Sequence, residues 1–442
     1  MELGHELALW TILPFVALLG CIAVLPLSAA HWWEHNRNKG LVVALLAVPL
    51  AVYLLGSFGS RGAHVLLEQG RDYLSFILLL GSLYVVTGGI QLRGSLSGTP
   101  LLNTAFLGIG AVIANVIGTT GASMLLVRPL LRANQARERK AHVFVFFIFV
   151  VSNCGGLLTP LGDPPLFLGF LRGVPFEWTL GLWREWLLVN GLLLLIFNLW
   201  DQAVFNREER ERPGSQLEEV MQHEPLRISG SHNFVYLVAL VAVIFAAGRG
   251  IGSGGGAWHW GFQEAAMLAV AALAYATTPA AVRAANAFSF GPILEVAVLF
   301  VGIFVTMAPA LLILNARGAS LGLHEPWHFF WASGLLSSFL DNAPTYLTFA
   351  SAAAGLAGVP IEGRYLATFL AHGSADVALL AAVSCGSVMM GANSYIGNGP
   401  NFMVKAIAEE AGVRMPTFFG YMLYSGGILI PLFGVVTLIF FR

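Results

Sequence analysis

Charged residues are scarce in this chain of 442 residues, and their scarcity excludes an ordinary soluble protein. Asp, Glu, Lys and Arg together make up 11% of the sequence, whereas soluble domains average about 25%. Hydrophobic residues make up 57%, and the mean hydropathy is +0.75. The composition therefore predicts an all-α polytopic membrane protein whose main partner is the lipid bilayer.

Cysteine and net charge are also low, and each excludes a class of protein. The three cysteines, Cys21, Cys154 and Cys385, stand far apart, so no disulfide framework or zinc motif is expected. The formal net charge of -1 is spread along the chain and offers no basic face for nucleic acid. The cysteines form no close pair that could hold a metal or act as a redox centre, which argues against a membrane enzyme, and no cofactor is predicted.

Long apolar runs predict about ten transmembrane helices, each of roughly 20 residues. The runs lie at 8–29, 41–59, 72–92, 142–171, 184–205, 233–248, 262–282, 292–315, 377–405 and 417–441. The first run is long for the core of a signal peptide and has no basic region before it, so it is interpreted as the first span.

Two further apolar runs, 101–131 and 327–357, are interrupted in the middle by polar residues and by glycine or proline. The first breaks at 115–121 and the second at Asp341-Asn-Ala-Pro-Thr345. Broken backbone at membrane depth needs a protein-lined polar surrounding. Each run is therefore predicted to be a re-entrant helical hairpin.

Lys and Arg residues are distributed unequally between the predicted loops. We place the N-terminus outside the cell, the first hairpin so that it enters the membrane from the cytoplasm, and the second so that it enters from outside. In this threading, 15 of the 23 Lys and Arg residues lie on the cytoplasmic side and 8 on the outer side. Cytoplasmic loops carry the basic excess in membrane proteins. This threading predicts a multi-pass protein of an inner (plasma) membrane.

A charged linker at 206–232 divides the chain almost in half. Residues 1–205 and 233–442 each contain three spans, a hairpin, an interrupted span and a last span, inserted with opposite topology. This layout predicts two inverted repeats. At an offset of 235 residues, the following positions match: Gly156, Thr159, Gly162, Asp163 and Pro165 fall on Gly391, Ser394, Gly397, Asn398 and Pro400.

The interrupted spans, 142–171 and 377–405, cannot be continuous helices, because proline removes a donor and glycine permits unwound backbone. Unwound backbone offers carbonyl oxygens to a cation, while half-helix N-termini offer N–H groups to an anion. Two hairpin tips that meet two unwound spans are expected to form one polar site at the bilayer midplane.

Asp163 and Asp341 are the predicted coupling residues of this site. Burial away from water favours the protonated form of a carboxyl group, and such a group binds either a proton or Na+ but not both. Hydroxyl and amide oxygens suit a hard cation. The residues expected to complete the ion site are Asn115, Thr119, Thr120, Asn153, Thr159, Asn342, Thr345, Asn393, Ser394 and Asn398.

Each of these residues also has a structural interpretation. Asp341 and Asp163 could cap helices, and individual Asn and Thr side chains hold membrane helices together. Asp376, His372 and Glu295 are candidates for a proton relay. Asp376 would otherwise cap a helix, His372 would make a structural hydrogen bond, and Glu295 would lie at the membrane interface.

The Asp341-Asn-Ala-Pro-Thr345 hairpin and the Gly-Asp-Pro-Pro and Gly-Asn-Gly-Pro breaks resemble the ion transporter superfamily. That group includes NhaD-type sodium/proton antiporters, citrate carriers and arsenite permeases. The resemblance covers nearly the whole chain in layout. It implies a two-repeat, often dimeric carrier that works by alternating access with a scaffold and a moving part. The first hairpin departs from the pattern, because Ala114 precedes Asn115 where Asp341 precedes Asn342.

These features predict a secondary transporter, with sodium/proton antiport as the first hypothesis and small inorganic cations and protons as its substrates. The alternative is a sodium- or proton-coupled carrier of citrate or another small organic anion, bound on helix N-termini. Two like charges about 4 Å apart repel by about 4 kcal/mol at an effective dielectric of about 20, so ionised aspartates would disfavour an anion. A channel with similar broken helices is a further alternative.

Overall fold

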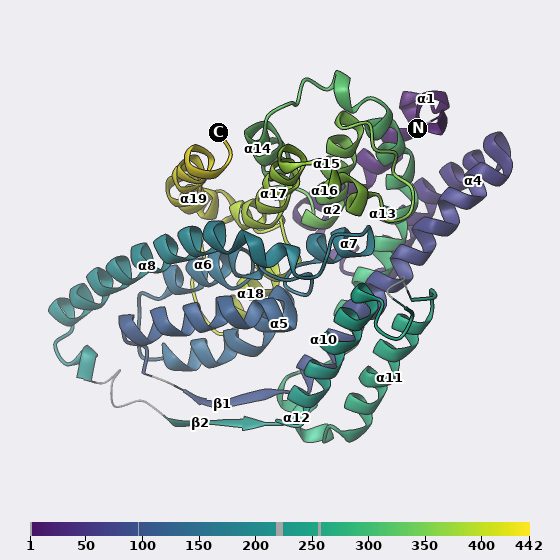
Figure 1. Ribbon diagram of the computed structural model, residues 1–442. Coiled ribbons are helices and arrows are strands. Elements are labelled where there is room, and N and C mark those ends of the chain that lie inside the picture. Colours follow the sequence, from purple (N-terminus) through teal and green to yellow (C-terminus); the bar gives the residue numbers. More distant parts are fainter. Residues whose placement is uncertain (1, 96, 218–223, 255–257) are drawn as a thin grey trace.

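The computed structural model describes residues 2–95, 97–217, 224–254 and 258–442, and it consists almost entirely of helices (Figure 1). In this part of the chain, seven helices are long and apolar enough to cross a membrane, and shorter apolar helices accompany them. The prediction of an all-α polytopic membrane protein is confirmed.

All ten predicted apolar runs fall on helices. In chain order the helices are α1 (Glu2–Glu6), α2 (Leu13–Ser28), α3 (Ala30–Trp33), α4 (Asn36–Gly88), α5 (Pro100–Ala133), α6 (Ala141–Val150), α7 (Pro164–Leu171), α8 (Trp183–Glu211), α10 (Asn233–Arg249), α11 (Phe262–Thr277), α12 (Ala280–Ala285), α13 (Gly291–Ala316), α14 (Pro326–Ser337), α15 (Asn342–Leu356), α16 (Tyr365–His372), α17 (Ser374–Met389), α18 (Gly399–Glu410) and α19 (Phe418–Phe440). Two short 3-10 turns, η2 (Cys154–Leu157) and η5 (Met390–Asn393), lie inside the interrupted spans.

The first hairpin is formed by α5, which folds back on itself at Gly118. This residue has a φ of 77°, a conformation that glycine adopts readily. Asn103 Nδ2 donates to Asn134 Oδ1 at 2.9 Å. The two residues are 31 positions apart, a length that would span about 47 Å in a straight helix. The ends of α5 therefore lie together, as predicted for a re-entrant hairpin.

The second hairpin is formed by α14 and α15, which pack against each other and are joined by residues 338–341. The helix α14 ends at Ser337, and α15 begins at Asn342. The helix α4 contains a similar break at Gly59, so it comprises two successive spans as the sequence predicts.

A small antiparallel ribbon of β1 (Gln91–Ser95) and β2 (Glu224–Ser229) is the one sheet in the described residues, and the sequence does not predict it (Figure 1). It pairs Leu92 with Ile228 and so ties the segment before the first hairpin to the predicted linker. The linker is also partly helical, because α8 continues to Glu211. Residues 218–223, which include Glu218 and Glu219, lie outside the described residues.

Ion pairs agree with the predicted threading, because each joins residues that the threading places on the same side of the membrane. The pairs are Arg172 with Asp72 at 2.5 Å, Arg249 with Glu177 at 2.7 Å, Lys39 with Glu295 at 2.7 Å, and Arg139 with Glu211 at 2.7 Å.

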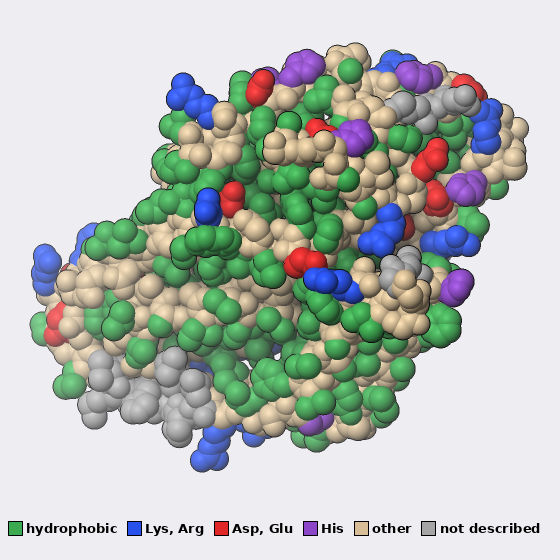
Figure 2. Space-filling view, viewed as in Figure 1, with side chains coloured by type: hydrophobic (Ala, Val, Ile, Leu, Met, Phe, Trp, Pro, Cys, Tyr) green, Lys and Arg blue, Asp and Glu red, His purple; other side chains and the backbone are tan. Residues whose placement is uncertain are grey.

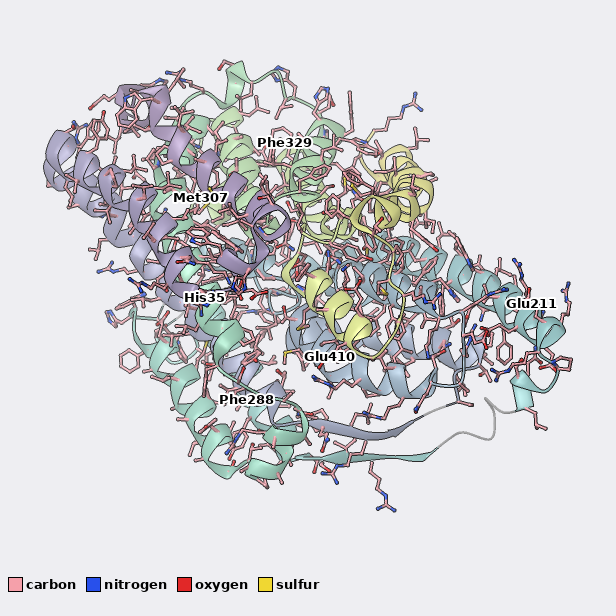
Figure 3. The ribbon with its side chains drawn as sticks, turned by 180° about the vertical axis from the view of Figure 1, so that it is seen from behind. His35, Glu211, Phe288, Met307, Phe329 and Glu410 are labelled. Carbon is pink, nitrogen blue, oxygen red and sulfur yellow. The ribbon has the colours of Figure 1, made fainter. Side chains whose placement is uncertain are left out.

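The molecular surface is largely apolar, as a lipid-facing surface requires. Hydrophobic side chains are spread over the whole face in Figure 2, with few charged ones among them. Leu45 and Val52 of α4 are among the exposed hydrophobic residues. The rear view in Figure 3 shows Met307 and Phe329, both buried, on the packed helices, whereas Glu211 lies at the outer end of α8. Because lipid cannot satisfy polar groups, polar residues that hold the helices together are expected in the protein interior.

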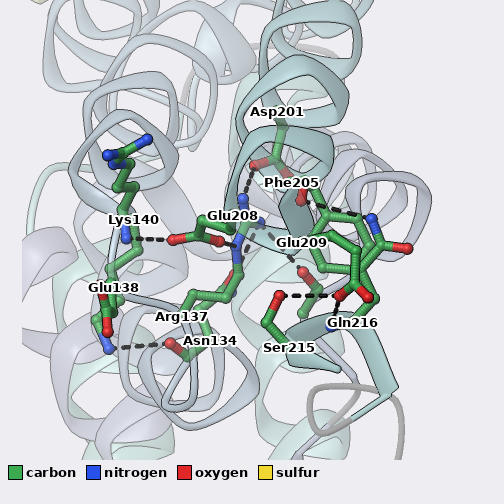
Figure 4. Close-up of polar contacts among 12 residues, drawn as sticks. Asn134, Arg137, Glu138, Lys140, Asp201, Phe205, Glu208, Glu209, Ser215 and Gln216 are labelled. Carbon is green, nitrogen blue, oxygen red and sulfur yellow. Dashed lines mark hydrogen bonds and ion pairs between the residues drawn. The ribbon is translucent and has the colours of Figure 1, made fainter. Parts of the chain in front are cut away.

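One such group fastens the base of the first hairpin to neighbouring helices, and Figure 4 shows three of its members, Asn134, Arg137 and Asp201. Asp201 of α8 is fully buried, and its Oδ1 lies 2.6 Å from Arg137 Nη2 and 2.7 Å from His142 Nε2. Asn103 Nδ2 donates to Asp201 Oδ2 at 3.1 Å. We call Asn103, Asn134, Arg137, His142 and Asp201 the base network. Its residues join α5, the α5–α6 connection, α6 and α8, so these elements are held as one unit.

Candidate functional site

Asp163 lies at the point where the first interrupted span becomes helical again. It is 1% exposed and occupies the N-cap position of α7, with extended backbone angles (φ -146°, ψ 144°). A residue before proline favours this extended conformation, and proline favours the first turn of a helix. The local sequence Gly-Asp-Pro-Pro thus ends the unwound segment and directs the Asp163 side chain away from α7.

The Asp163 carboxyl group accepts hydrogen bonds from three elements that are distant in sequence. Its Oδ1 accepts from Thr119 Oγ1 at 2.7 Å and from Asn398 Nδ2 at 3.3 Å. Its Oδ2 accepts from Asn342 Nδ2. We call these four residues the Asp163 cluster. Two of the donors come from the first hairpin tip and the second hairpin, and the third precedes α18, so the structure brings both hairpins and both interrupted spans together.

No Lys or Arg in the described residues pairs with Asp163; its partners are one hydroxyl and two amide groups. Neutral donors stabilise the carboxylate without cancelling its charge. A buried carboxylate is costly unless it is protonated or paired. The cluster is therefore chemically suited to exchange a proton for a cation.

A second layer of asparagines connects the two interrupted spans. Asn398 Nδ2 lies 3.2 Å from Asn153 Oδ1, and Asn153 Nδ2 donates to Asn401 Oδ1 at 2.7 Å. Asn401 Nδ2 donates to the carbonyl groups of Gly391 and Ser394 at 2.8 and 2.9 Å. Asn401 is absent from the predicted residues, although it ends the Asn-Gly-Pro-Asn sequence that begins with Asn398.

The first hairpin tip is bonded to the first interrupted span. Thr159 Oγ1 donates to the Asn115 carbonyl oxygen, and the Leu158 amide donates to Asn115 Oδ1 at 2.7 Å. The Thr159 hydroxyl also accepts from the Leu161 amide at 3.2 Å. Asn115 and Thr159 thus position the unwound segment that carries Asp163.

The second half has a corresponding arrangement. Ser394 Oγ donates to the Ser338 carbonyl oxygen at 2.5 Å and accepts from the Ile396 amide at 3.2 Å. Asn393 Nδ2 donates to Ser338 Oγ at 2.9 Å. Ser338 has no place among the predicted residues, because its role depends on contacts with a segment more than 50 positions away.

Asp341 caps α15 and lies next to the cluster in sequence. Its Oδ1 accepts from the Ala343 amide at 3.0 Å, and its carbonyl oxygen accepts from Thr345 Oγ1 at 2.9 Å. The side chain is half-buried. The structure therefore gives Asp341 the capping role considered from the sequence, while Asn342 beside it reaches Asp163.

A cavity of about 110 Å³ adjoins Asp163. Its polar lining includes Tyr84, Thr87 and Thr120, and the rest is mostly apolar residues of α4, the tip of the first hairpin, the segment that carries Asp163, α13 and α18. Thr120 is exposed, whereas Thr119 beside it is buried in the Asp163 cluster. The cavity gives a small solute a place beside the cluster.

The three candidates for a proton relay lie elsewhere. His372 and Asp376 face each other at the start of α17, with 3.6 Å between Nδ1 and Oδ2. Glu295 pairs with Lys39 where α13 meets α4. In the described residues, none of these three side chains hydrogen-bonds to the Asp163 cluster, so the structure does not bring them into the site.

Any cation at this site would depend on one carboxylate with neutral oxygens. The described residues contain no group of three or more His, Cys, Asp or Glu side chains that could hold a metal ion. Among the same residues, Asn342 Oδ1 and Asn393 Oδ1 are buried without a hydrogen-bond partner. Amide oxygens are ligands for hard cations, so the donor set fits Na+ better than a transition metal.

A comparison with protein families gives an independent indication of function. A family model described as "Putative citrate transport" matches residues 4–441, nearly the whole chain. No curated protein matches the chain.

Proposed function

This chain belongs to the family described as "Putative citrate transport", and on that premise we propose that it is a secondary active transporter coupled through Asp163. The observation that supports the proposal is the enclosure of a buried carboxyl group by Thr119, Asn342 and Asn398, with no basic partner among the described residues. The form of coupling that this geometry supports best is exchange of Na+ for H+.

In this mechanism, Asp163 holds either a proton or Na+. The ionised carboxylate together with the oxygens of Thr119 and Asn342 would ligate the cation, and protonation of Asp163 would release it. Because one group serves both ions, loading one requires loss of the other. Alternating access of the site to the two sides converts this competition into antiport.

The exchange would be carried by two inverted repeats, 1–205 and 233–442, in an inner (plasma) membrane and within a homodimer. Local geometry supports the repeat. Asp163 and Asn398, at the offset of 235, both occupy the position before a helix, with side chains that point elsewhere and nearly equal backbone angles: φ -146° and ψ 144° against φ -149° and ψ 141°. Thr159 and Ser394 make equivalent bonds to their hairpin tips.

A second candidate function is coupled transport of a citrate-like anion, which the family description favours. The anion would occupy the cavity beside Thr120, and Na+ or a proton on Asp163 would remove the repulsion between two negative charges. Both candidates use Asp163 as the coupling group. They differ in whether an organic anion moves with the cation.

The test is a flux measurement on purified protein in pH-loaded liposomes, with a pH-sensitive dye in the lumen. For antiport, external Na+ should release protons from the lumen, and citrate should not be required. K+ and Li+ in separate assays give the cation selectivity, and protein-free liposomes give the leak.

Uptake of labelled citrate that depends on Na+ or H+, without proton release by Na+ alone, would replace antiport by anion transport. Flux that never concentrates a solute against its gradient would indicate a channel and contradict both candidates.

Replacement of Asp341 by Asn separates its charge from its capping role. Asn caps helices as well as Asp does, so the Asp341→Asn protein should keep its thermal stability. If the Asp341 charge contributes to the ion site, coupled exchange should fall at least about tenfold, equivalent to about 1.4 kcal/mol.

Asp341→Ala is the companion variant, because it should lose about 1 kcal/mol of stability through the missing cap. Wild-type exchange in Asp341→Asn would remove Asp341 from the ion site and leave it as a cap.

A further inference from the structure

A groove on the surface of the molecule lies where the start of α8 meets the end of α19, two helices that pack side by side (Figure 1). It has a volume of about 540 Å³ and is lined by Phe440 of α19 and by the α8 residues Trp183, Arg184, Leu187, Leu188, Gly191 and Leu192. Further along α8, Trp200 stacks on Tyr424 with ring centroids 5.6 Å apart, so the two helices run antiparallel. The threading places this end of both helices on the outer side of the membrane. We call the groove the α8 groove.

The α8 groove runs along the helix axis. Its α8 residues occupy two adjacent positions on three successive turns, and side chains four residues apart lie one above another on the same helix face. From Arg184 to Leu192 the helix rises about 12 Å, and half of the hydrocarbon core of a bilayer is about 15 Å thick. The groove therefore extends from one membrane surface almost to the midplane, as a single acyl chain does.

A different face of the same turns of α8 holds the first interrupted span. Trp186 Nε1 donates to the Gly155 carbonyl oxygen at 2.8 Å, and Asn190 Nδ2 donates to the Cys154 carbonyl oxygen at 3.1 Å. Neither Trp186 nor Asn190 lines the groove. A molecule bound in the groove would therefore press on the helix that supports this unwound segment, without contact with the segment itself.

Arg184 is the charged residue of the lining, and its donors are unused. The side chain is exposed, and among the described residues it forms no hydrogen bond or ion pair; its guanidinium carbon lies 5.5 Å from the centre of the Trp183 ring. Glu185 beside it does not line the groove, and its Oε2 is buried. Tryptophan in a membrane helix typically lies at the depth of the lipid headgroups. Arg184 therefore offers a guanidinium group, which suits phosphate, at the depth where lipid phosphates lie.

Gly191 lies in the middle part of the groove. A Cβ atom at this position would meet no other atom within 4 Å, so packing among the described residues does not require glycine here. Glycine destabilises the interior of a helix relative to alanine. A glycine with this cost and no packing role inside the chain points to a molecule outside the chain that packs against the bare backbone.

We propose that the α8 groove binds one phospholipid of the outer leaflet, with its phosphate on Arg184 and one acyl chain along the apolar lining past Gly191. A second copy of this chain fits the groove less well. In a twofold dimer the same patch faces itself, and because the lining contains no carboxylate, such a contact would leave Arg184 without an anionic partner. The inference goes beyond the proposed transport function and does not depend on it.

The test is a titration of the purified full-length protein in detergent with phosphatidylglycerol, in which native mass spectrometry counts the bound lipids. Wild-type protein should show a saturable site. Diacylglycerol with the same acyl chains lacks the phosphate and should bind at least about fivefold more weakly, the factor for one basic residue at a membrane surface. Glycerol phosphate, which lacks the acyl chains, should show no saturable binding.

Two variants test the two parts of the site, each with a matched control. Arg184→Gln should remove the advantage of phosphatidylglycerol over diacylglycerol, whereas Arg364→Gln should keep it, because Arg364 is exposed on the same side but lies outside the groove. Gly191→Phe should remove saturable binding of both lipids, because the ring fills the groove. Gly427→Phe should keep binding, since Gly427 is an exposed glycine of α19 that also has open space at its Cβ position but does not line the groove.

Equal lipid binding by the Gly191→Phe and Gly427→Phe proteins would overturn the inference, as would wild-type preference for phosphatidylglycerol in Arg184→Gln or the absence of saturable binding to the wild-type protein. If Gly191→Phe converts a dimer into a monomer and leaves lipid binding unchanged, the groove is an interface between two copies of the chain, and the inference fails as well. None of these outcomes bears on the flux test of Asp163, because the groove shares no residue with the Asp163 cluster.

Discussion

The Asp163→Asn protein should show no coupled exchange beyond the leak of protein-free liposomes. Asparagine keeps the size and shape of the side chain but cannot take up or lose a proton, so competition between H+ and Na+ disappears. Its amide nitrogen would also face donors from Thr119, Asn342 or Asn398. This mismatch should cost about 1 to 3 kcal/mol of stability, which thermal unfolding in detergent would measure.

Asp376→Asn is the matched control for this variant. Asp376 is a half-buried carboxylate in the second half, and it faces His372 at the start of α17 and not the cluster. Its replacement should leave exchange at the wild-type rate. Full exchange by folded Asp163→Asn protein would reject Asp163 as the coupling group, and loss of exchange in Asp376→Asn would restore the relay predicted from the sequence.

Removal of Asp201 should give the largest loss of stability. In the Asp201→Ala protein, buried Arg137 loses the carboxylate 2.6 Å from its Nη2 and keeps only the more distant Glu208, 3.5 Å from its Nε, while His142 loses its partner at 2.7 Å. Breaking a buried ion pair by removal of one partner typically costs about 3 to 5 kcal/mol. The measurement is the unfolding free energy in detergent, and the first hairpin should become more accessible to cysteine labelling.

The double variant Asp201→Leu with Arg137→Met distinguishes the loss of the closest ion-pair partner of buried Arg137 from lost packing. If the weakly paired charge of Arg137 is responsible, the double variant should recover most of the lost stability, because well-packed apolar residues replace buried ion pairs at little cost. Glu211→Ala is a surface control, since Glu211 pairs with exposed Arg139 and Arg207 and should contribute little. Equal destabilisation by Asp201→Ala and by the double variant would contradict the role assigned to the charge.

Arg137 illustrates what a sequence pattern conveys and what it omits. The five basic residues between 128 and 140 predict a cytoplasmic loop through their number alone. In the structure, Arg137 is 4% exposed and bonded within the base network. Nothing in the local sequence separates it from Arg139, which is on the surface and pairs with Glu211, because the difference is made by Asp201 on another helix.

The two aspartates show the same limit at the candidate site. Both lie in apolar, Gly- and Pro-rich stretches, so the sequence predicts ion binding for both of them equally. The structure places three donors around Asp163 and a helix N-terminus at Asp341. The participation of Asp341 in ion binding therefore remains a prediction, whereas its cap is observed.

Sequence by itself determined the membrane class, the positions of the apolar helices, the two hairpins and the two interrupted spans. These features follow from local causes: the length of an apolar run fixes where a helix can cross, and glycine and proline fix where it breaks. The tertiary structure alone decided which polar groups meet. The bonds from Asn342 and Asn398 to Asp163 span 179 and 235 positions, and the base network and the β1–β2 ribbon depend equally on distant segments. Side-chain partners across such separations are set by how helices pack, and no local pattern of residues encodes that packing.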